Sequence, residues 1–270
     1  PEAIEDSLDS LKKTTECSGS RESEWVFSQF NRLVRERLVV PYYQPIVRMS
    51  DLSDTAFEAL ARSEVPGLCN PKLMFDAASL LSRNAELSSL CRERAVEVAR
   101  PLGPTYMLFV NTHPDEDLET GVMPQLLALQ ESHPELQVVL EVHEATVHNP
   151  HKMRDFIARL NDHGILLAYD DFGAGRSRLL ELVQAPPHVL KFDINFIRGI
   201  DTAPVHQRRM VKLLVEMTRD FATATLAEGV ETAEEAEVCR EIGFDFAQGY
   251  LYGRPLPIER LYEGCVELCR

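Results

Sequence analysis

The stretch Ile165-Leu166-Leu167-Ala168-Tyr169-Asp170-Asp171-Phe172-Gly173-Ala174-Gly175 decides how the rest of the chain is interpreted. An apolar run that ends in two adjacent carboxylates and a glycine-rich turn is typical of a buried strand that ends at a charged site. Neighbouring carboxylates repel each other unless a cation lies between them. Asp170 and Asp171 therefore indicate a divalent metal ion.

The composition predicts a globular, acidic protein. The chain has 270 residues, of which 44% are hydrophobic and 26% charged, and this is enough to bury a large core. The formal net charge of −15 argues against the broad basic surface that tracks a nucleic-acid backbone. We therefore expect no nucleic-acid polymer as a partner, and an anionic nucleotide would have to be held by metal ions or a few local cations.

Cysteine spacing and hydropathy point to a cytoplasmic domain. The six cysteines form neither a C-x-x-C pair nor a zinc-ligand spacing, so we expect them to be reduced. The longest apolar runs fall short of the roughly 18 residues that a membrane span requires, and no signal peptide is evident. Because the chain starts at Pro1 without a methionine, we expect it to be cut from a larger protein with an upstream sensor or regulatory domain.

The beginning of the chain predicts a linker followed by one folded domain. Residues 1–23 are polar and charged, which is typical of a linker, and residues 24–270 hold the domain. Apolar positions from Trp25 to Leu38 recur at helical steps and predict an amphipathic helix. The predicted strands Val39–Met49 and Thr55–Arg62 follow with only a short polar connection, so they should pair antiparallel.

Beyond Arg62, helices and single strands alternate. Helices are expected at roughly 71–82, 86–101, 119–131, 150–163, 175–184, 204–220, 233–242 and 257–268. Further strands are expected at Tyr106–Asn111, Gln137–Val142, Ile165–Asp170, Val189–Asp193, Thr223–Glu228 and Phe244–Gln248. Eight strands with helices between them match an α/β fold of the (β/α)8 TIM type better than an open doubly wound sheet.

Seven polar residues lie at or near the C-terminal ends of predicted strands, where barrel enzymes place their chemistry. They are Glu58, Asn111, Glu141, Asp170, Lys191, Glu228 and Gln248. Carboxylate and amide oxygens without cysteine suit Mg²⁺ or Mn²⁺. Asp170 followed by Asp171 could bridge two ions. Two neighbouring ions stabilise the attacking and leaving oxygens of an in-line displacement at phosphorus. Lys191 could orient the water nucleophile or offset phosphoryl charge.

Several ordered motifs make the chain similar to the EAL family of cyclic di-GMP phosphodiesterases, over about residues 38–262. The motifs are Gln44-Pro45-Ile46-Val47, Glu58-Ala59-Leu60 with Arg62, Glu141-Val142-His143-Glu144, Asp170-Asp171-Phe172-Gly173, Lys191-Phe192-Asp193, Ala227-Glu228-Gly229-Val230-Glu231-Thr232, Gln248-Gly249-Tyr250 and Arg254-Pro255-Leu256-Pro257. The resemblance implies a modified barrel whose first strand is antiparallel, which agrees with the missing first crossover. It also implies hydrolysis of cyclic di-GMP to the linear dinucleotide pGpG with two Mg²⁺ or Mn²⁺ ions, and it implies a homodimer.

The resemblance also assigns roles to individual residues. One metal would be bound by Glu58, Asn111, Glu141 and Asp170, and the other by Asp170, Asp171 and Glu228. Lys191 resembles the lysine that orients water, so the catalytic set is Lys191, Glu58, Asp170, Asp171 and Glu228. The substrate side comprises Gln44, Arg62, Asp193 and Pro255, with Glu231 and Gln248 as a supporting polar shell. Glu144 resembles a glutamate that anchors the loop after Asp171.

The chain departs from the family pattern in three places, of which the first bears on regulation and dimer geometry. The loop usually reading D-D-F-G-T-G-Y-S-S is here Asp170-Asp171-Phe172-Gly173-Ala174-Gly175-Arg176-Ser177-Arg178, and it couples metal binding to dimerisation in the family. Ser63 replaces a common tryptophan, and His143 replaces a threonine between two glutamates. His143 shares strand parity with Glu141, so it is either a further metal ligand or a packed, hydrogen-bonded histidine.

Three functions compete on this sequence. An active phosphodiesterase is favoured because no candidate ligand is missing, whereas a catalytically silent cyclic di-GMP receptor typically lacks one or more of them. The altered loop keeps the receptor open as an alternative. A barrel used only for interaction would leave the complete ligand set unexplained.

Overall fold

The computed structural model describes residues 24–146, 149–173 and 179–261. The predicted linker at 1–23, most of the last predicted helix and the altered positions 174–178 lie outside these ranges. Among the described cysteines, Cys69, Cys91 and Cys239 are free thiols. Across the described ranges, every helix is too short or too polar to span a lipid bilayer.

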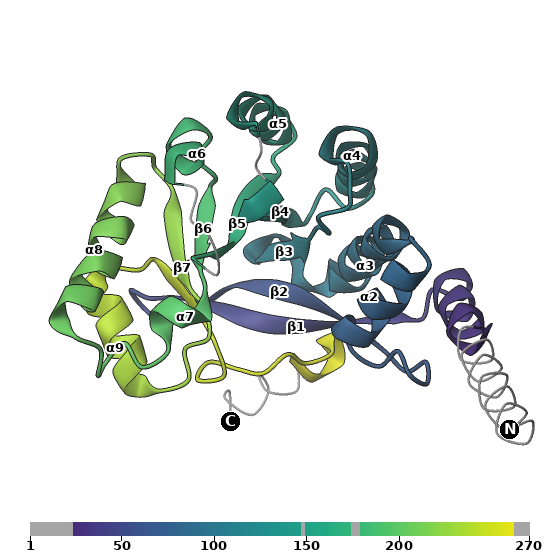
Figure 1. Cartoon of the computed structure of the whole chain (residues 1–270), viewed down its shortest axis with the longest axis horizontal. Coiled ribbons are helices and arrows are strands. Elements are labelled where there is room, and N and C mark those ends of the chain that lie inside the picture. The colour runs from purple at the N-terminus through teal and green to yellow at the C-terminus, as the bar shows by residue number, and fades with distance from the viewer. Residues whose placement is uncertain (1–23, 147–148, 174–178, 262–270) are drawn as a thin grey trace, which may run out of the picture.

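Eight strands form a closed barrel in the order β1 to β8 (Figure 1). Their bounds are β1 Val39–Arg48, β2 Asp54–Ser63, β3 Met107–Asn111, β4 Gln137–His143, β5 Leu166–Phe172, β6 Val189–Phe192, β7 Ala224–Ala227 and β8 Phe246–Gln248. Strand β1 is antiparallel to both β2 and β8, and the other neighbours pair parallel. The predicted antiparallel first strand is confirmed, because the connection of residues 49–53 is too short for a crossover.

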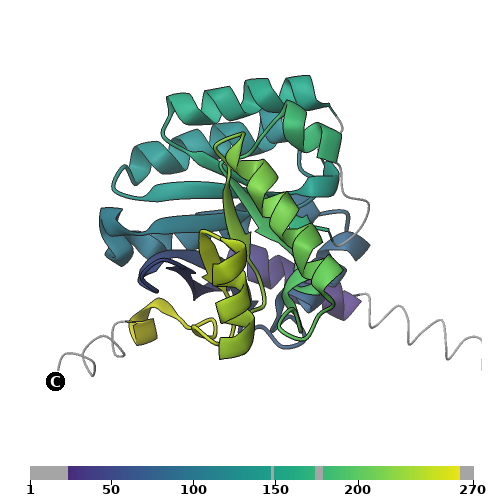
Figure 2. The ribbon, with the colours of Figure 1, turned by 90° about the vertical axis from the view of Figure 1, so that its left-hand side faces the viewer.

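Helices surround the barrel, as the two perpendicular views show (Figures 1 and 2). Their bounds are α2 Pro71–Leu80, α3 Asn84–Ala99, α4 Met123–Ser132, α5 Pro150–Asp162, α6 Leu179–Gln184, α7 Ile194–Ile197, α8 Val205–Arg219 and α9 Ala233–Ile242, with a further helix at 24–35. Helix α7 was not predicted, because four residues are too few for a periodic pattern. It begins at Asp193, whose side chain accepts a hydrogen bond from the backbone N–H of Asn195.

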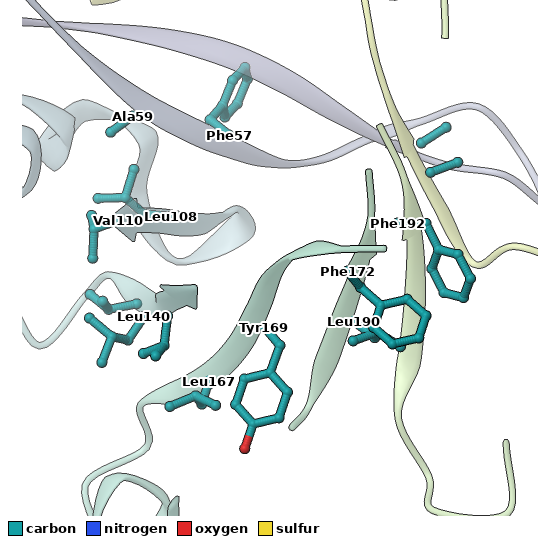
Figure 3. Packing of buried hydrophobic residues seen from close by; sticks show 14 of the residues in the cluster. Phe57, Ala59, Leu108, Val110, Leu140, Leu167, Tyr169, Phe172, Leu190 and Phe192 are labelled. Atoms are coloured by element: carbon teal, nitrogen blue, oxygen red, sulfur yellow. The ribbon is translucent and has the colours of Figure 1, made fainter. Parts of the chain in front are cut away.

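Residues that alternate along the strands build two apolar layers. Outward-facing side chains pack against the helices in one large cluster, and Figure 3 shows its members Phe57, Leu108, Leu140, Tyr169 and Phe192 on successive strands. Inward-facing side chains form a separate floor inside the barrel. The floor consists of Ile46, Ala56, Phe109, Val139, Ala168, Val189 and Leu226, with Phe246 packed against it. The seven polar residues predicted at strand ends each lie two positions from a floor residue, so they are on the same, inward face of their strands.

Strand β8 leads directly into a close contact between two backbones. A Cβ built on Gly249 would lie 2.0 Å from the backbone oxygen of Val230, in the segment that follows β7. The same segment is tied down by hydrogen bonds from Val230 N to Gln248 O and from Leu251 N to Val230 O, both 3.1 Å. A glycine at 249 therefore sets the spacing between two loops at the rim of the barrel.

We expect Gly249→Ala to lower the free energy of unfolding by about 1–3 kcal/mol, because a backbone atom cannot move aside as a flexible side chain can. The measurement is urea denaturation of the purified chain. Gly121→Ala is the matched control, since nothing lies within 4 Å of its Cβ position. Equal stabilities for the two variants would contradict the close contact at Gly249.

Candidate active site

A polar layer lies directly above the apolar floor. On every strand, the residue two positions from the floor residue is polar, counted forward on β2 to β8 and backward on the antiparallel β1. The layer comprises Gln44, Glu58, Asn111, Glu141, Asp170, Lys191, Glu228 and Gln248. Glu58 differs from expectation, because it lies in the middle of β2 rather than near its end. Its strand continues past the barrel rim in pairing with β1.

Lys191 lies at the centre of this layer, surrounded by carboxylates. Its Nζ is 2.6 Å from Oε1 of Glu141, 2.8 Å from Oδ1 of Asp170, 2.9 Å from Oε1 of Glu228 and 3.7 Å from Oε2 of Glu58. The lysine side chain is only 1% exposed. One ammonium thus faces four carboxylates away from bulk water, so the negative charge is only partly balanced.

Asp170 and Asp171 face the same site although they are adjacent in β5. Consecutive residues of a regular strand point to opposite faces. Here the pairing of β5 with β6 shifts register between Tyr169 and Phe172, and Asp171 has a positive φ of 58°. This left-handed residue, which aspartate tolerates better than most side chains, redirects the second carboxylate. Carboxylate oxygens of Asp170, Asp171 and Glu228 consequently lie within 4.8 Å of one another.

Side-chain amides hold Glu58 in place. Asn111 donates from Nδ2 to Oε1 of Glu58 over 3.0 Å, and Gln248 donates from Nε2 to Oε2 over 2.7 Å. Gln248 also reaches Oε1 of Gln44 over 3.3 Å, and Gln44 donates to the backbone oxygen of Gly253 over 3.1 Å. The amides connect β1, β2, β3 and β8 and leave Oδ1 of Asn111 as the atom that could bind an ion.

Burial shifts the proton affinities of these groups. Burial, reinforced by Glu58, raises the pKa of Glu141 well above its ordinary range. Burial likewise raises the pKa of Glu228 to about 8, with Lys191 opposing the shift. Burial alone would lower the pKa of Lys191, but Asp170 and the other carboxylates together raise it well above the ordinary value. The raised pKa values favour protonated carboxyl groups over carboxylates, and this lowers the negative charge of the site when no metal ion is bound.

The residues fit hard divalent cations. Asp170, Asp171 and Glu228 form a cluster of three carboxylates close enough to share one ion. Despite the nearby ammonium, neither carboxylate oxygen of Glu141 receives a well-directed hydrogen bond from any described residue, nor does Oδ1 of Asp170. Buried oxygens without directed donors are costly unless a cation satisfies them. The donor set is all oxygen, which suits Mg²⁺ or Mn²⁺.

Four of the predicted site residues have partners outside the carboxylate cluster. Arg62 lies over the ring of Tyr42, 5.7 Å from its centroid, and Asp193 caps α7. Glu231 is held by Arg198 through bonds of 2.5 and 2.7 Å. Pro255 precedes Leu256, whose backbone exchanges two hydrogen bonds with the Tyr43 backbone. These four residues line the rim rather than the charged centre.

Two predicted positions lie next to the acidic segment of β5. His143 places Nε2 3.5 Å from Oδ2 of Asp171, so the histidine contacts a candidate ligand. Glu144 is buried, and part of the loop that it was expected to anchor lies outside the described residues.

Two hollows flank Glu58 and Leu60. One has a volume of about 300 Å³, and its walls include Phe75 and His113, whose rings stack on each other. The other has a volume of about 320 Å³ and is lined by Ile194 and Tyr250 among others. Both include Glu58 and Leu60 in their walls, so the carboxylate cluster borders each of them.

Sequence reasoning missed a buried ion pair beside the site, between Arg92 of α3 and Glu116 in the loop after β3. A signal for it exists in the sequence. Arg92 lies four residues after the buried Ser88 and three before the buried Ala95, on a helix face that is otherwise uncharged. A charge on the buried face of a predicted helix indicates a buried partner.

Comparison with known proteins agrees with the geometry. The model of the EAL domain family matches residues 28–255. The probable cyclic di-GMP phosphodiesterase PdeN of Escherichia coli (strain K12) is 30% identical over 235 residues, which are 83% of this chain and 45% of PdeN. The chain thus spans less than half the length of that relative.

Solved structures show the same fold. The PaMucR phosphodiesterase in complex with c-di-GMP matches with a TM-score of 0.77 and 26% identity, covering 88% of this chain and 99% of that one. The manganese and cyclic di-GMP complex of Klebsiella pneumoniae BlrP1 matches with a TM-score of 0.71 and 29% identity, covering 81% of this chain and 56% of that one. From the sequence match and the shared barrel, the chain belongs to the EAL domain family.

Proposed function

We propose that this chain hydrolyses cyclic di-GMP to linear pGpG with two divalent metal ions. The observation that carries the proposal is the set of four carboxylates around the buried Lys191, with Asp171 beside them. The relatives' names, which describe cyclic di-GMP phosphodiesterases, support the substrate. A receptor that only binds the nucleotide would not require so much uncompensated negative charge at its centre.

The candidate ligands fall into two groups that share Asp170. Glu58, Asn111, Glu141 and Asp170 would hold one ion, and Asp170, Asp171 and Glu228 would hold the other. Divalent ions at such a site supply an activated water and neutralise charge that develops on phosphate oxygens. The complex of BlrP1 with manganese and cyclic di-GMP supports this choice of cofactor.

The remaining roles follow from the contacts of the chain's own residues. Lys191 holds its proton on Nζ, because the surrounding carboxylates raise its pKa, and so it offers a fixed ammonium to the reacting water or to a phosphate oxygen. Asn111 and Gln248 keep the Glu58 carboxylate oriented. The closed barrel below the site keeps bulk water away from the buried side of the charges.

The two hollows suit a ligand with two bases. Cyclic di-GMP carries a guanine on either side of its phosphodiester ring, and the hollows lie on either side of Glu58 and Leu60 with similar volumes. Each combines apolar walls with a few polar groups, as binding sites for flat ring systems do. Gln44, Glu231 and Gln248 line the second hollow, which supports their assignment to the substrate side.

Two wider features belong to the same proposal. A homodimer is supported by exposed apolar side chains on α6, where Leu179, Leu180 and Val183 are 39%, 75% and 45% exposed. A sensor domain elsewhere in the protein is supported by the greater length of the relatives. Light scattering with the nucleotide present tests the dimer, and a monomeric mass would count against it.

The direct test is to incubate the purified chain with cyclic di-GMP and Mg²⁺ or Mn²⁺, and to follow the linear product by chromatography. We expect pGpG to accumulate, and chelation of the metal to stop the reaction. Tight binding of the nucleotide without turnover in either metal would instead favour the receptor function.

We expect Asp170→Asn to lower turnover at least about 100-fold, since changing even an outer partner of a metal ligand costs about 10–100-fold. The same substitution should not lower the melting temperature without metal, because it removes one of several mutually repelling carboxylates. Asp155→Asn, on the exposed face of α5, is the matched control and should retain full activity. Normal turnover by Asp170→Asn would place the site elsewhere.

The metal-free chain should lose stability as pH rises from about 5 to 8. The folded chain keeps a proton on Glu228, whose pKa is about 8, while the unfolded chain releases it near the ordinary value of 4.5. Because the folded state then binds more protons, its stability falls with pH. Lys191 adds no slope in this window, since its pKa lies above 10.5 in the folded state and at that value in the unfolded state.

The measurement is a series of thermal melts in chelator, comparing the wild type with Glu228→Gln. In a domain of this size each kcal/mol lost lowers the melting temperature by about 2–4 °C. Between pH 5 and 8, the melting temperature of the wild type should therefore fall by more than about 2–4 °C relative to that of Glu228→Gln. Parallel pH profiles would show that Glu228 is ionised in the metal-free fold.

A further inference from the structure

A buried ion pair ties helix α3 to the loop that follows β3. Arg92 donates from Nη1 to Oε2 of Glu116 over 2.7 Å and from Nη2 to Oε1 over 2.5 Å. The two side chains are 1% and 4% exposed. This is a bidentate pair with almost no access to water, a geometry that fixes direction as well as distance.

The same guanidinium contacts the candidate metal site through the main chain. Nη1 of Arg92 also donates to the backbone oxygen of Asn111 over 3.1 Å. Glu116 accepts a 2.8 Å hydrogen bond from the backbone N–H of His113, two residues further along. Arg92 therefore binds the carbonyl group of the residue whose side chain donates to Glu58, and through Glu116 it also holds the backbone that follows this residue.

Further polar contacts fix the pair itself. Gln125 of α4 accepts from Nε and Nη2 of Arg92 over 2.9 and 2.7 Å, and Ser88 donates to Glu116 over 2.6 Å. Asn84 at the start of α3 donates to Asp115 in the same loop over 2.7 Å. The contacts of Asn84, Ser88 and Arg92 join α3 to the loop, and Gln125 fixes the guanidinium of Arg92 from α4, so the loop is held in one position relative to α3.

Stability alone does not explain a charge pair in this place. Replacing a buried ion pair with well-packed apolar residues is often neutral or stabilising, because two charges must be taken out of water. What the pair provides, and an apolar contact would not, is a directed bond to one carbonyl oxygen. The flat, forked guanidinium can donate hydrogen bonds to Glu116 and to the backbone oxygen of Asn111 at the same time. A lysine ammonium on a flexible stem does this less well.

We propose that Arg92 and Glu116 are positioning residues, which fix Asn111, and through it Glu58, in the arrangement that binds a divalent ion. The inference rests on the proposed function, since it assigns a role within the same site. Neither residue touches the carboxylate cluster. They bind the backbone at Asn111 and His113, and of these two residues Asn111 is the one whose side chain donates to Glu58. This makes the inference testable by a double substitution that includes Asn111.

The experiment measures Mn²⁺ binding to the full chain, without nucleotide, by calorimetry and by the paramagnetic resonance of free Mn²⁺. We expect Arg92→Met to weaken the binding of one of the two ions by about 10-fold or more, as substitutions of other outer partners of metal ligands do. Arg92→Lys should lie between Arg92→Met and the wild type. Asn111→Ala should weaken the same ion, and the double variant should bind no worse than Asn111→Ala, because the two changes act through one residue.

Leu90→Ala is the matched control for stability. Leu90 is buried on α3 but packs in the cluster around Phe30 and Leu87, away from the loop. It should lower the melting temperature and leave Mn²⁺ affinity unchanged. If Arg92→Met melts below the assay temperature, Glu116→Gln replaces it, since the amide still accepts from His113 but loses the charge. An intact Glu116→Gln chain should also bind Mn²⁺ more weakly.

Two results would overturn the inference alone. These are Mn²⁺ affinity within about twofold of wild type in intact Arg92→Met or Glu116→Gln, and full additivity of Arg92→Met with Asn111→Ala. Absence of Mn²⁺ binding by the wild-type chain would overturn the two-ion function together with the inference. The failure of the positioning role and the failure of the function are therefore distinguishable.

Discussion

The rest of the structure depends on the contact between one buried ammonium and four carboxylates at the centre of the barrel. Lys191 lies within 2.6–3.7 Å of Glu141, Asp170, Glu228 and Glu58. Such a cluster is unfavourable unless its charges are balanced, because little water reaches it. Burial raises the pKa values of Glu141 and Glu228, and this favours protonated carboxyl groups in the metal-free fold. The binding of a divalent ion would thus be coupled to proton release.

The alternation of side chains along a strand explains how a barrel can hold this cluster without losing its core. Residues of one parity face inward, so each strand supplies one floor residue and, two positions away, one polar residue. The floor keeps water out from below, while the opposite parity packs against the helices (Figure 3). Charges that lie on an apolar floor interact more strongly with one another and with a bound ion than they would at an open surface.

Much of this arrangement is contained in the sequence, and the exceptions have physical causes. Strand order and the antiparallel β1 follow from apolar runs and one short connection. Strict alternation, however, would send Asp171 away from Asp170, and only the left-handed backbone at Asp171 brings them together. That conformation depends on pairing with β6, which no local pattern encodes.

Long-range polar contacts are the other part that local patterns do not predict. The partners Arg92 and Glu116 are 24 residues apart, and Arg198 and Glu231 are 33 apart. Glu231 was expected in the polar shell on the substrate side, and it lines the second hollow, but its bidentate contact with Arg198 was not predicted. The position of a motif predicts where a residue lies along the barrel. Tertiary contacts decide which groups its charged side chain meets.

The exposure of the carboxylates divides the site into two unequal halves. Glu141 is 0% and Glu58 10% exposed, and this half adjoins β3, whose last residue is held by Arg92. Asp171 is 42% and Glu228 18% exposed, and this half lies at the ends of β5 and β7. An ion in the first half would be shielded from water, whereas an ion in the second half would keep more of its water ligands. Asp170 contacts Lys191 together with Glu141 and also lies in the cluster with Asp171 and Glu228, so its position beside the irregular pairing of β5 and β6 connects the dry half to the accessible one.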